Sequence, residues 1–286
     1  MQFWIVQTLN SLALGGLLFL LAAGFSLIFG LMRIANLTHG SLFMLGAYIG
    51  VSILKFVPNL WLAALLGGVA VAAFGGLLER LILRRLAGNV LGQVLVTLGV
   101  AYIIADLCLM VWGGDPIPLP TPELLRQPIV IGGVAFPSYR LVVVGIAIVT
   151  AIALYLLMER TRLGAMIRAG VDDMQMARAV GIPVSRLFTI VFCLGSALAG
   201  AGGIIGGPIL SAYPGLDFDM LPLALIVVIL GGVGSLLGAF VGSFIIGAIY
   251  TFGTALLPGL AYVILFLPMI FVIAFRPRGL FGKVTT

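Results

Sequence analysis

Residues 3–32 read FWIVQTLNSLALGGLLFLLAAGFSLIFGLM and contain no Asp, Glu, Lys or Arg. A helix crosses the hydrocarbon core of a bilayer with about 20 consecutive apolar residues, so this stretch is long enough to span a membrane. Its apolar residues are continuous and do not alternate with polar ones, which argues against a strand of a β-barrel. The stretch therefore predicts a membrane-spanning helix, and the number of similar stretches decides the fold class.

The composition agrees with a membrane protein. Of the 286 residues, 62% are hydrophobic and only 8% are charged, and a soluble domain of this length needs more charge on its surface. The 39 glycines point the same way, because small residues allow transmembrane helices to approach closely. The formal net charge of +6 is typical of cationic loops on the cytoplasmic side, and it does not indicate a nucleic-acid partner.

The remaining spans follow from the other runs without charged residues. These runs are 34–54, 56–78, 86–105, 141–158, 187–216 and 220–275. The last is too long for one span, and Gly231-Gly232, Gly234-Ser235 and Pro258-Gly259 mark where it folds back. We expect an all-α polytopic membrane protein, with a bundle of about eight transmembrane helices in one domain over 1–286. The count becomes nine if the short or re-entrant segment 221–230 also crosses.

The orientation follows from where lysine and arginine fall in the loops. With the N-terminus outside, one side receives only Lys55, Arg126 and Arg140. The other side receives Arg33, Arg80, Arg84, Arg85, Arg160, Arg162, Arg168, Arg178, Arg186, Arg276, Arg278 and Lys283. The arginine-rich side is therefore expected to be cytoplasmic, which also places the C-terminus in the cytoplasm. Residues 113–139 then form an external loop, and residues 159–186 form a cytoplasmic loop.

The cytoplasmic loop reads ERTRLGAMIRAGVDDMQMARAVGIPVSR. Small and apolar residues recur in it at steps of three and four, which predicts a short amphipathic helix over 166–181, ended by Gly181 and Pro183. Two interpretations are open. The loop either only fixes topology through its charges, or it presents a small-residue face to a groove on a cytosolic partner. The small-residue face favours docking.

Residues 33–41, RIANLTHGS, contain consecutive polar side chains beside the first span and the only histidine of the chain. Consecutive polar residues cannot share one face of a helix, so we expect a break whose backbone meets a cavity or water. Ionisable groups inside a span are costly, and this adds Asp106 as a candidate. The candidate substrate pathway is Asn36, Thr38, His39, Gly40 and Asp106. His39 either touches substrate or only holds the break, and Asp106 either serves transport or a structural hydrogen bond.

Catalytic and cofactor motifs are absent from the sequence. No G-x-x-x-x-G-K-[ST] phosphate loop occurs, and the glycine-rich GGVGSLLG at 231–238 lies in an apolar run that suits helix packing. One histidine and two separated cysteines make no convincing metal site. We therefore expect no enzyme activity, no metal and no cofactor bound by this chain.

Several stretches resemble one family of transporters. GAMIRA (164–169) followed by DDMQMARAVGI (172–182) is similar to the coupling loop of ATP-binding-cassette (ABC) importer permeases of the branched-chain amino acid family, LivH type. RIANLTHGSLFMLGAY (33–48), VILGGVGSLLGAFVGSFIIG (228–247) and RPRGLFG (276–282) resemble the same family. The resemblance implies a set of residues that couple the permease to ATPases: Gly164, Arg168, Ala169, Gly170, Asp173, Ala177 and Gly181.

This resemblance also implies a function and partners. The chain would be a multi-pass permease subunit that moves branched-chain, hydrophobic amino acids across the bacterial inner membrane. Its partners would be a LivM-like sister permease, two cytosolic ATPases (LivG- and LivF-like) that bind the ATP, a periplasmic or lipid-anchored substrate-binding protein, and membrane lipid. Two alternatives remain: a related ABC permease for urea or short amides, and a stand-alone secondary transporter. The secondary transporter would need acid or base groups in the middle of the membrane, and only Asp106 and His39 are candidates.

Overall fold

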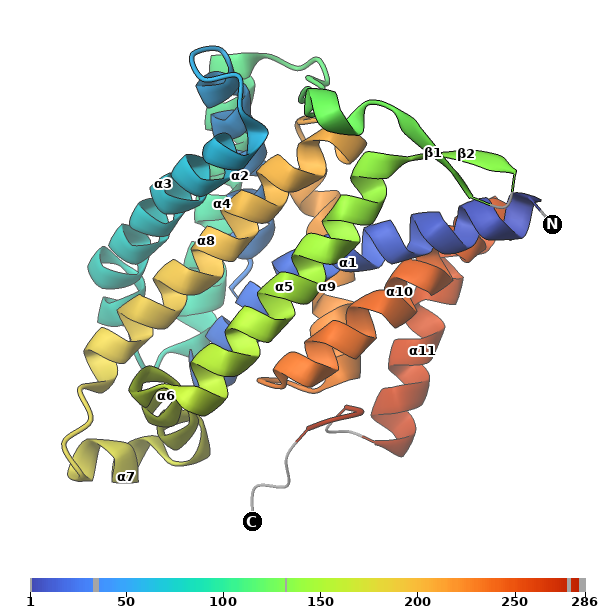
Figure 1. The fold of residues 1–286 in the computed structure, drawn as a ribbon. Coiled ribbons are helices and arrows are strands. Elements are labelled where there is room, and N and C mark those ends of the chain that lie inside the picture. The colour runs from blue at the N-terminus through green and yellow to red at the C-terminus, as the bar shows by residue number, and fades with distance from the viewer. Residues whose placement is uncertain (1, 33–35, 132, 277–278, 283–286) are drawn as a thin grey trace.

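The computed structural model describes residues 2–32, 36–131, 133–276 and 279–282, and it is almost entirely helical (Figure 1). Short elements accompany the helices: η1 (Leu83–Leu86), η2 (Glu123–Leu125), η3 (Pro258–Leu260), β1 (Pro128–Ile131) and β2 (Val134–Pro137). The helices are α1 (Gln2–Met32), α2 (Thr38–Leu54), α3 (Leu60–Leu81), α4 (Val90–Trp112), α5 (Ser138–Arg160), α6 (Arg162–Asp172), α7 (Met174–Ala179), α8 (Val184–Leu210), α9 (Leu216–Gly231), α10 (Leu236–Leu256) and α11 (Ala261–Phe275).

The helix lengths confirm an all-α polytopic membrane protein. Six segments are long and apolar enough to cross a bilayer: α1, α3 with η1, α4, α5, α8 and α10. Two shorter apolar helices, α2 and α11, account for the other expected spans. The segment 221–230, which the sequence left undecided, belongs to α9, a helix of 16 residues. Among the described residues, six helices are therefore long enough to span a bilayer, and α2, α9 and α11 are shorter, with 17, 16 and 15 residues.

The long apolar run 220–275 folds back at both expected places. At the first, α9 ends in Gly231, and Gly232 and Gly234 take positive φ angles of 100° and 76°, which only glycine adopts without strain. Ser235 then caps α10 by accepting a hydrogen bond from the backbone N–H of Gly238. At the second, Pro258-Gly259 forms the 3-10 turn η3 between α10 and α11.

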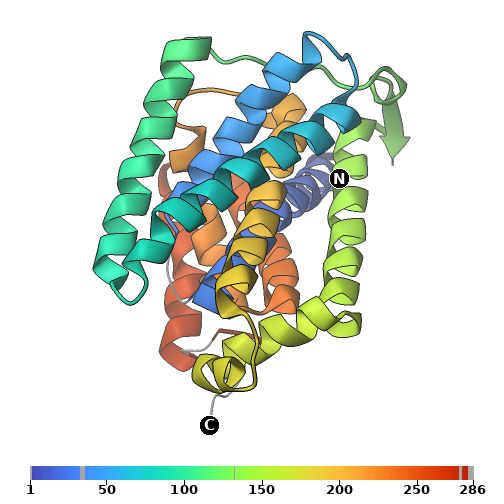
Figure 2. The same ribbon diagram turned by 90° about the vertical axis from the view of Figure 1, so that its left-hand side faces the viewer.

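Glycines bring the central helices into backbone contact. α1 lies at the centre and packs against α5, α8 and α10, while α8 also packs against α2 and α3. A Cβ atom added to Gly46 would overlap the backbone of Gly200, and one added to Gly24 would overlap Gly195. The peripheral helices α4 and α5 stand on opposite sides of this core in Figure 2, and most of their surface is exposed.

The two ends of the bundle carry different structures (Figure 1). At one end, here the hairpin end, β1 and β2 form an antiparallel pair with Pro128 opposite Pro137. Beside it, Ile117 and Ala212 exchange two backbone hydrogen bonds of 2.8 Å, which tie the α4–α5 connection to the segment between α8 and α9. At the other end, here the α6–α7 end, the two short helices α6 and α7 lie between α5 and α8.

Candidate functional site

The helix is interrupted at the start of the polar stretch, where Asn36 and Leu37 are not helical. The expected break does not extend further, because Thr38, His39 and Gly40 belong to the first turn of α2. α1 ends at Met32 and α2 begins at Thr38; Arg33, assigned to the cytoplasmic side, lies outside the described residues. The Asn36 Oδ1 atom accepts a hydrogen bond of 3.1 Å from the Thr38 N–H. The Thr38 hydroxyl donates to the Thr97 carbonyl of α4 at 2.9 Å. These contacts hold the start of α2 against α4.

Protein encloses the surroundings of this break, and Asn36 lines a small internal cavity there. Asn36 is 2% exposed, and Thr38 and His39 are completely buried in protein. The His39 Nε2 atom lies 3.0 Å from the Leu21 carbonyl oxygen of α1, which can only accept, so Nε2 carries the proton. These side chains are not exposed as expected, because α1 and α4 cover them and accept hydrogen bonds from His39 and Thr38. The Asn36 Nδ2 and His39 Nδ1 atoms are buried without a hydrogen-bond partner among the described residues.

Gly40 allows α9 to approach the start of α2. A Cβ atom on Gly40 would lie 2.7 Å from the Asp217 carbonyl oxygen and 2.8 Å from the Leu221 Cβ. One residue further on, the Ser41 hydroxyl donates a 2.8 Å hydrogen bond to the Asp217 carboxylate. The other carboxylate oxygen, Oδ1, is buried without a hydrogen-bond partner among the described residues. A buried carboxylate therefore lies directly beside the predicted polar break.

Sequence reasoning missed Asp217 because it separates two apolar runs and was treated as part of a connection. The available signal was the order Pro214-Gly215 followed by an acidic residue, which is typical of a helix beginning. Gly215 has a φ of 100°, and Asp217 lies in the first turn of α9, where the helix dipole favours a negative charge.

Asp106 lies apart from the residues of the break. Its side chain is on the exposed face of α4, one turn from Tyr102, whose ring is 5.6 Å from that of Phe218 in α9. Next to Phe218, Asp219 is also exposed and accepts a 2.5 Å hydrogen bond from the Tyr213 hydroxyl. We call Tyr102, Asp106, Phe218 and Asp219 the α4–α9 face. It exposes two carboxylates on helices of the membrane-spanning bundle.

The loop 159–186 contains two helices instead of the single one expected over 166–181. Thr161 caps α6 by accepting a hydrogen bond from the Gly164 N–H at 3.1 Å. At Asp173 the backbone is extended, and its carboxylate accepts from the N–H groups of Gln175 and Met176 at 2.9 and 3.0 Å. Asp173 thus ends α6 and caps α7, because its side chain replaces the hydrogen bonds that a continuous helix would supply.

The predicted end of this segment is confirmed. Gly181 has a φ of 86°, and its N–H donates to the Arg178 carbonyl. The Ile182 N–H reaches back to the Ala177 carbonyl at 3.0 Å, which is the hydrogen bonding of a glycine C-cap. Pro183 then directly precedes α8.

The small-residue face of the loop points inward, which corrects its expected role as a docking surface. Gly164, Gly170 and Ala177 are buried, and a Cβ atom on Gly170 would lie 3.0 Å from Leu31 of α1. Arg168 pairs with Glu159 at 3.5 Å, and Ala169 is half-buried. The residues of this stripe pack α6 and α7 against the rest of the chain, whereas Asp173 and Gly181 are exposed.

Two apolar side chains are exposed in and directly after α7. Met176 is 61% exposed and Val180 is 69% exposed, and they are four residues apart at the tip of the α6–α7 end. Both side chains are therefore accessible to a partner in the single chain.

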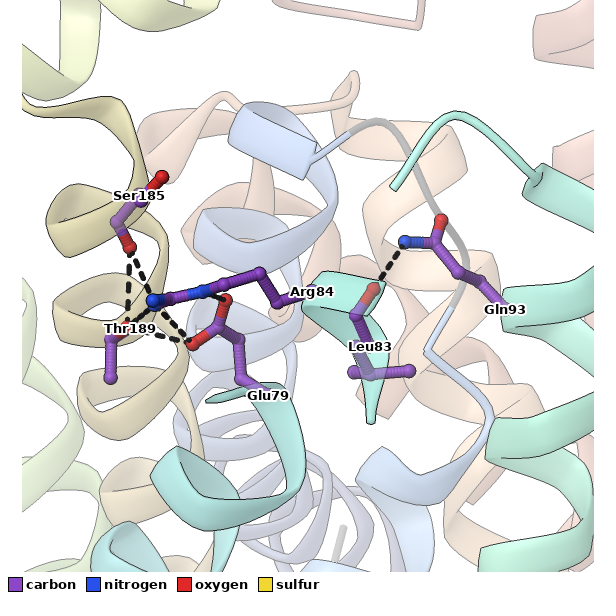
Figure 3. A network of polar contacts seen from close by, with 6 residues as sticks. All are labelled: Glu79, Leu83, Arg84, Gln93, Ser185 and Thr189. Carbon is purple, nitrogen blue, oxygen red and sulfur yellow. Dashed lines mark hydrogen bonds and ion pairs between the residues drawn. The ribbon is translucent and has the colours of Figure 1, made fainter. Parts of the chain in front are cut away.

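A polar network connects this end of the chain to α3 (Figure 3). The Glu79 carboxylate is completely buried and pairs with the Arg84 guanidinium at 3.1 Å. Arg84 also donates to the Ser185 carbonyl at 2.9 Å, and the Thr189 hydroxyl donates to Glu79 at 2.7 Å. The network therefore joins α3 and η1 to the first turns of α8, directly after α7.

A second bond in Figure 3 extends this connection toward the break. The Gln93 side-chain amide of α4 donates to the Leu83 carbonyl of η1 at 3.1 Å. Gln93 and Leu83 line the same small internal cavity as Asn36 and Thr97. Gln93 thus contacts η1 and lines the cavity that Asn36 also lines, one turn before Thr97 in α4.

Comparisons with known proteins agree with this architecture. The protein family described as "Branched-chain amino acid transport system / permease component" matches residues 7–273. The branched-chain amino acid permease BraD of Pseudomonas aeruginosa is 28% identical over 98% of this chain and 96% of its own length. LivH of Escherichia coli K12, another such permease, is 25% identical over 98% of this chain and 96% of its own length.

Two further matches are a relative named for a different cargo and a solved structure of low sequence identity. LsrC of Enterobacter sp. 638, an autoinducer 2 import permease, is 30% identical over 86% of this chain and 71% of its own length. The solved structure of PsaBC from Streptococcus pneumoniae in complex with Fab shares the fold, with a TM-score of 0.50 at 14% identity. The structural match covers 93% of this chain and 89% of that one.

The family match spans almost the whole chain, so this protein belongs to the permease components of branched-chain amino acid transport systems.

Proposed function

We propose that this chain is the transmembrane permease subunit of an ABC importer that carries branched-chain, hydrophobic amino acids across the bacterial inner membrane. The observation that carries this proposal is the similarity to BraD and LivH over nearly the full length of both chains. Membership of the permease family argues against the stand-alone carrier, because such a permease works with separate ATPases. ATP is bound by those partners, and this chain needs no cofactor of its own.

The proposed orientation has the α6–α7 end in the cytoplasm and the hairpin end outside. Arg126 and Arg140 flank the hairpin, whereas Arg84, Arg162 and Arg178 lie at or beside the α6–α7 end. Lysine and arginine are enriched in short loops on the cytoplasmic side of a membrane, which supports this orientation. The N-terminus is then outside and the C-terminus inside.

Coupling to two ATPases of the LivG and LivF type takes place at α7 in this proposal. Met176 and Val180 supply the apolar surface that enters a groove on the ATPase. The inward residues Gly164, Gly170 and Ala177 keep α6 and α7 seated on the bundle. A push on α7 then reaches α3 through Ser185, Thr189 and Arg84.

In this proposal, a sister permease of the LivM type covers the α4–α9 face. Charged side chains on transmembrane helices face a bundle interior or a water-filled cavity, because hydrocarbon does not solvate them. Asp106 and Asp219 are exposed in the single chain, so a second permease has to cover this face and enclose a polar path. A carboxylate on that path suits the ammonium group of an amino acid delivered by an external binding protein.

A second candidate cargo is supported by the LsrC similarity, which is the highest identity among the relatives described here. In that case the chain would import autoinducer 2 or a similarly polar molecule. Urea and short amides remain the third possibility, on the resemblance of motifs alone.

Reconstitution tests the proposal directly. The tagged chain is purified with the subunits that accompany it and placed in proteoliposomes, with ATP in the lumen and labelled leucine and the binding protein outside. We expect leucine uptake that depends on ATP and is reduced by isoleucine and valine but not by urea or autoinducer 2. Uptake driven by a proton gradient without ATP would contradict the importer, and uptake of autoinducer 2 in place of leucine would change the cargo.

A further inference from the structure

A polar pocket lies at the hairpin end, away from the α4–α9 face. It has a volume of about 410 Å³ and lies between the first turns of α1, the start of α5 and the ends of α8 and α10. Its polar lining comes from Gln7, Asn10, Arg140, Thr251 and Thr254. These residues come from three helices that are far apart in the sequence, so tertiary folding gathers them.

Arg140 is the charged residue in the lining of this pocket, and no carboxylate pairs with it among the described residues. Its guanidinium is half-buried and donates to the Asn10 side-chain oxygen of α1. Arg84, Arg126 and Arg168 each pair with a carboxylate, whereas no such pair forms at Arg140 within the described ranges. A partly buried guanidinium with a neutral partner retains its capacity to bind an anion.

A second pocket adjoins the first at Arg140, and its other cation, Arg126, is paired with Glu123. It has a volume of about 250 Å³, shares Arg140 and Ile209 with the first, and adds Arg126, Thr121 and Tyr139. No Asp or Glu is among the residues that line either pocket. Arg140 is also in the first turn of α5, where the helix dipole adds positive potential. An anion is therefore favoured over a cation.

The floor of the first pocket is apolar and is formed by Ala13, Leu14, Leu17 and Leu210. A bare inorganic ion would leave this floor uncovered, whereas an amphiphile would bury it. We propose that the pocket binds an oxyanion attached to an aliphatic body, with the oxyanion on Arg140 and the body against α1 and α8. Asn10 acts as a positioning residue, because it holds the guanidinium at the wall between the two pockets.

Two sources supply this chemistry. One is the phosphate of an anionic phospholipid headgroup, which reaches the pocket from the membrane. The other is the carboxylate of an aliphatic amino acid, and only this source rests on the proposed function. Both sources need the Arg140 charge, so the same variants test both.

The lipid source is tested with the purified full complex in nanodiscs that contain equal amounts of phosphatidylglycerol and phosphatidylcholine. After detergent exchange, native mass spectrometry counts the phosphatidylglycerol molecules retained per complex. Arg140→Gln should lower this retention about tenfold, because a hydrogen bond with a charged partner is the stronger kind. Arg140→Lys should keep part of it. Arg160→Gln, at the other end of α5, is the matched control and should retain the wild-type amount.

The amino-acid source is tested by equilibrium dialysis of the delipidated complex, without ATP, using labelled leucine and leucinamide as probes. Leucinamide lacks the carboxylate, so it should bind about tenfold more weakly than leucine to the wild type and equally to Arg140→Gln. Size-exclusion profiles establish that each variant is still assembled. If Arg140→Gln loses assembly, Asn10→Ala replaces it, with the same expected direction.

Each outcome decides the proposal. Loss of phosphatidylglycerol retention in Arg140→Gln supports the lipid source, and loss of discrimination between leucine and leucinamide supports the amino-acid source. If neither probe distinguishes the wild type from Arg140→Gln in an assembled complex, the pocket is not an anion site. Since these assays use no ATP and no transport, that failure would leave the importer proposal unaffected.

Discussion

Ser41 and Asp217 are 176 positions apart in the chain, yet the Ser41 hydroxyl lies 2.8 Å from the Asp217 carboxylate in the interior of the bundle. This bond joins the start of α2 to the start of α9, and it places a negative charge where no sequence run suggested one. A charge buried with a single side-chain donor makes that donor important, because its loss leaves the carboxylate without compensation.

We expect Ser41→Ala to lower the free energy of unfolding by roughly 2 kcal/mol, since a hydrogen bond to a charged group contributes about 1.5–3 kcal/mol. In an Asp217→Asn background, Ser41→Ala should lower the free energy of unfolding by less, because a neutral amide loses less than a carboxylate when its donor is removed. Thermal unfolding of the four proteins in detergent measures this coupling. Ser243→Ala is the control, since its hydroxyl bonds only within its own helix. Equal losses in both backgrounds would show that the bond does not hold the two helices.

Gly46 is expected to tolerate no side chain. Gly46→Ala should destabilise the fold by about 1–3 kcal/mol, because a Cβ atom there overlaps the backbone of Gly200 and α2 has to move away from α8. Gly145→Ala in α5 is the matched change, since a Cβ atom there meets nothing within 4 Å. It should be neutral or slightly stabilising. A thermal unfolding midpoint of Gly46→Ala equal to that of Gly145→Ala would contradict the backbone contact.

The two faces of α7 should respond differently to substitution. Met176→Asp with Val180→Asp should abolish stimulated ATP hydrolysis and uptake while leaving the permease folded, because only the exposed surface is changed. Ala177→Leu should instead lower the thermal stability of the permease, since Ala177 is buried against this chain. Co-purification of the ATPases and unfolding midpoints separate the two effects. A folded and uncoupled Ala177→Leu would place the docking surface on the inward side.

Removing only Arg84 should be worse than removing the whole ion pair. Arg84→Met leaves the buried Glu79 carboxylate without its cation, and breaking a fully buried pair in this way costs about 3–5 kcal/mol. The Arg84 side chain is 36% exposed and Thr189 still donates to Glu79, so we expect a loss below that range. The double variant Glu79→Gln with Arg84→Met removes the charge as well, so it should recover much of the stability. If coupling passes through Arg84, the stable double variant will still hydrolyse ATP without proportionate uptake. Wild-type coupling in the double variant would make the network structural only.

Asp106 is expected to serve the pathway through its charge. Asp106→Leu and Asp106→Asn should both reduce leucine uptake, with the assembled complex and basal ATP hydrolysis preserved, because the side chain is exposed on the α4–α9 face. Glu123→Gln provides the control, as Glu123 is an exposed carboxylate near the hairpin. Full uptake by Asp106→Leu would show that this part of α4 faces lipid.

Much of the fold could be predicted because its determinants are local. The lengths of the apolar runs predicted the helices, and Gly232, Gly234 and Pro258 predicted the turns that the structure contains. An interruption beside Asn36 was also visible in the polar residues that follow α1, although Thr38 to Ser41 are themselves helical. Each of these features depends on neighbouring residues in the chain.

Other features depend on contacts between distant parts of the chain, and sequence reasoning could not reach them. The partner of Ser41 lies in α9, and the burial of Asn36 and His39 depends on helices that cover them. Periodicity gave the small-residue stripe of the loop, but periodicity cannot tell whether Gly170 and Ala177 face this chain or a partner. The interruption at Asp173 did leave a signal, because an aspartate that can cap Gln175 and Met176 competes with a continuous helix.

The glycine contacts of the central helices have a mechanical consequence. Where backbone touches backbone, as at Gly46 with Gly200 and Gly24 with Gly195, no flexible side chain can repack to let one helix slide past the other. We therefore expect α1, α2 and α8 to move together. In the proposed importer, a change between outward and inward openings would tilt these helices as a unit against a neighbouring subunit, with the lightly packed α4 and α5 at the margins.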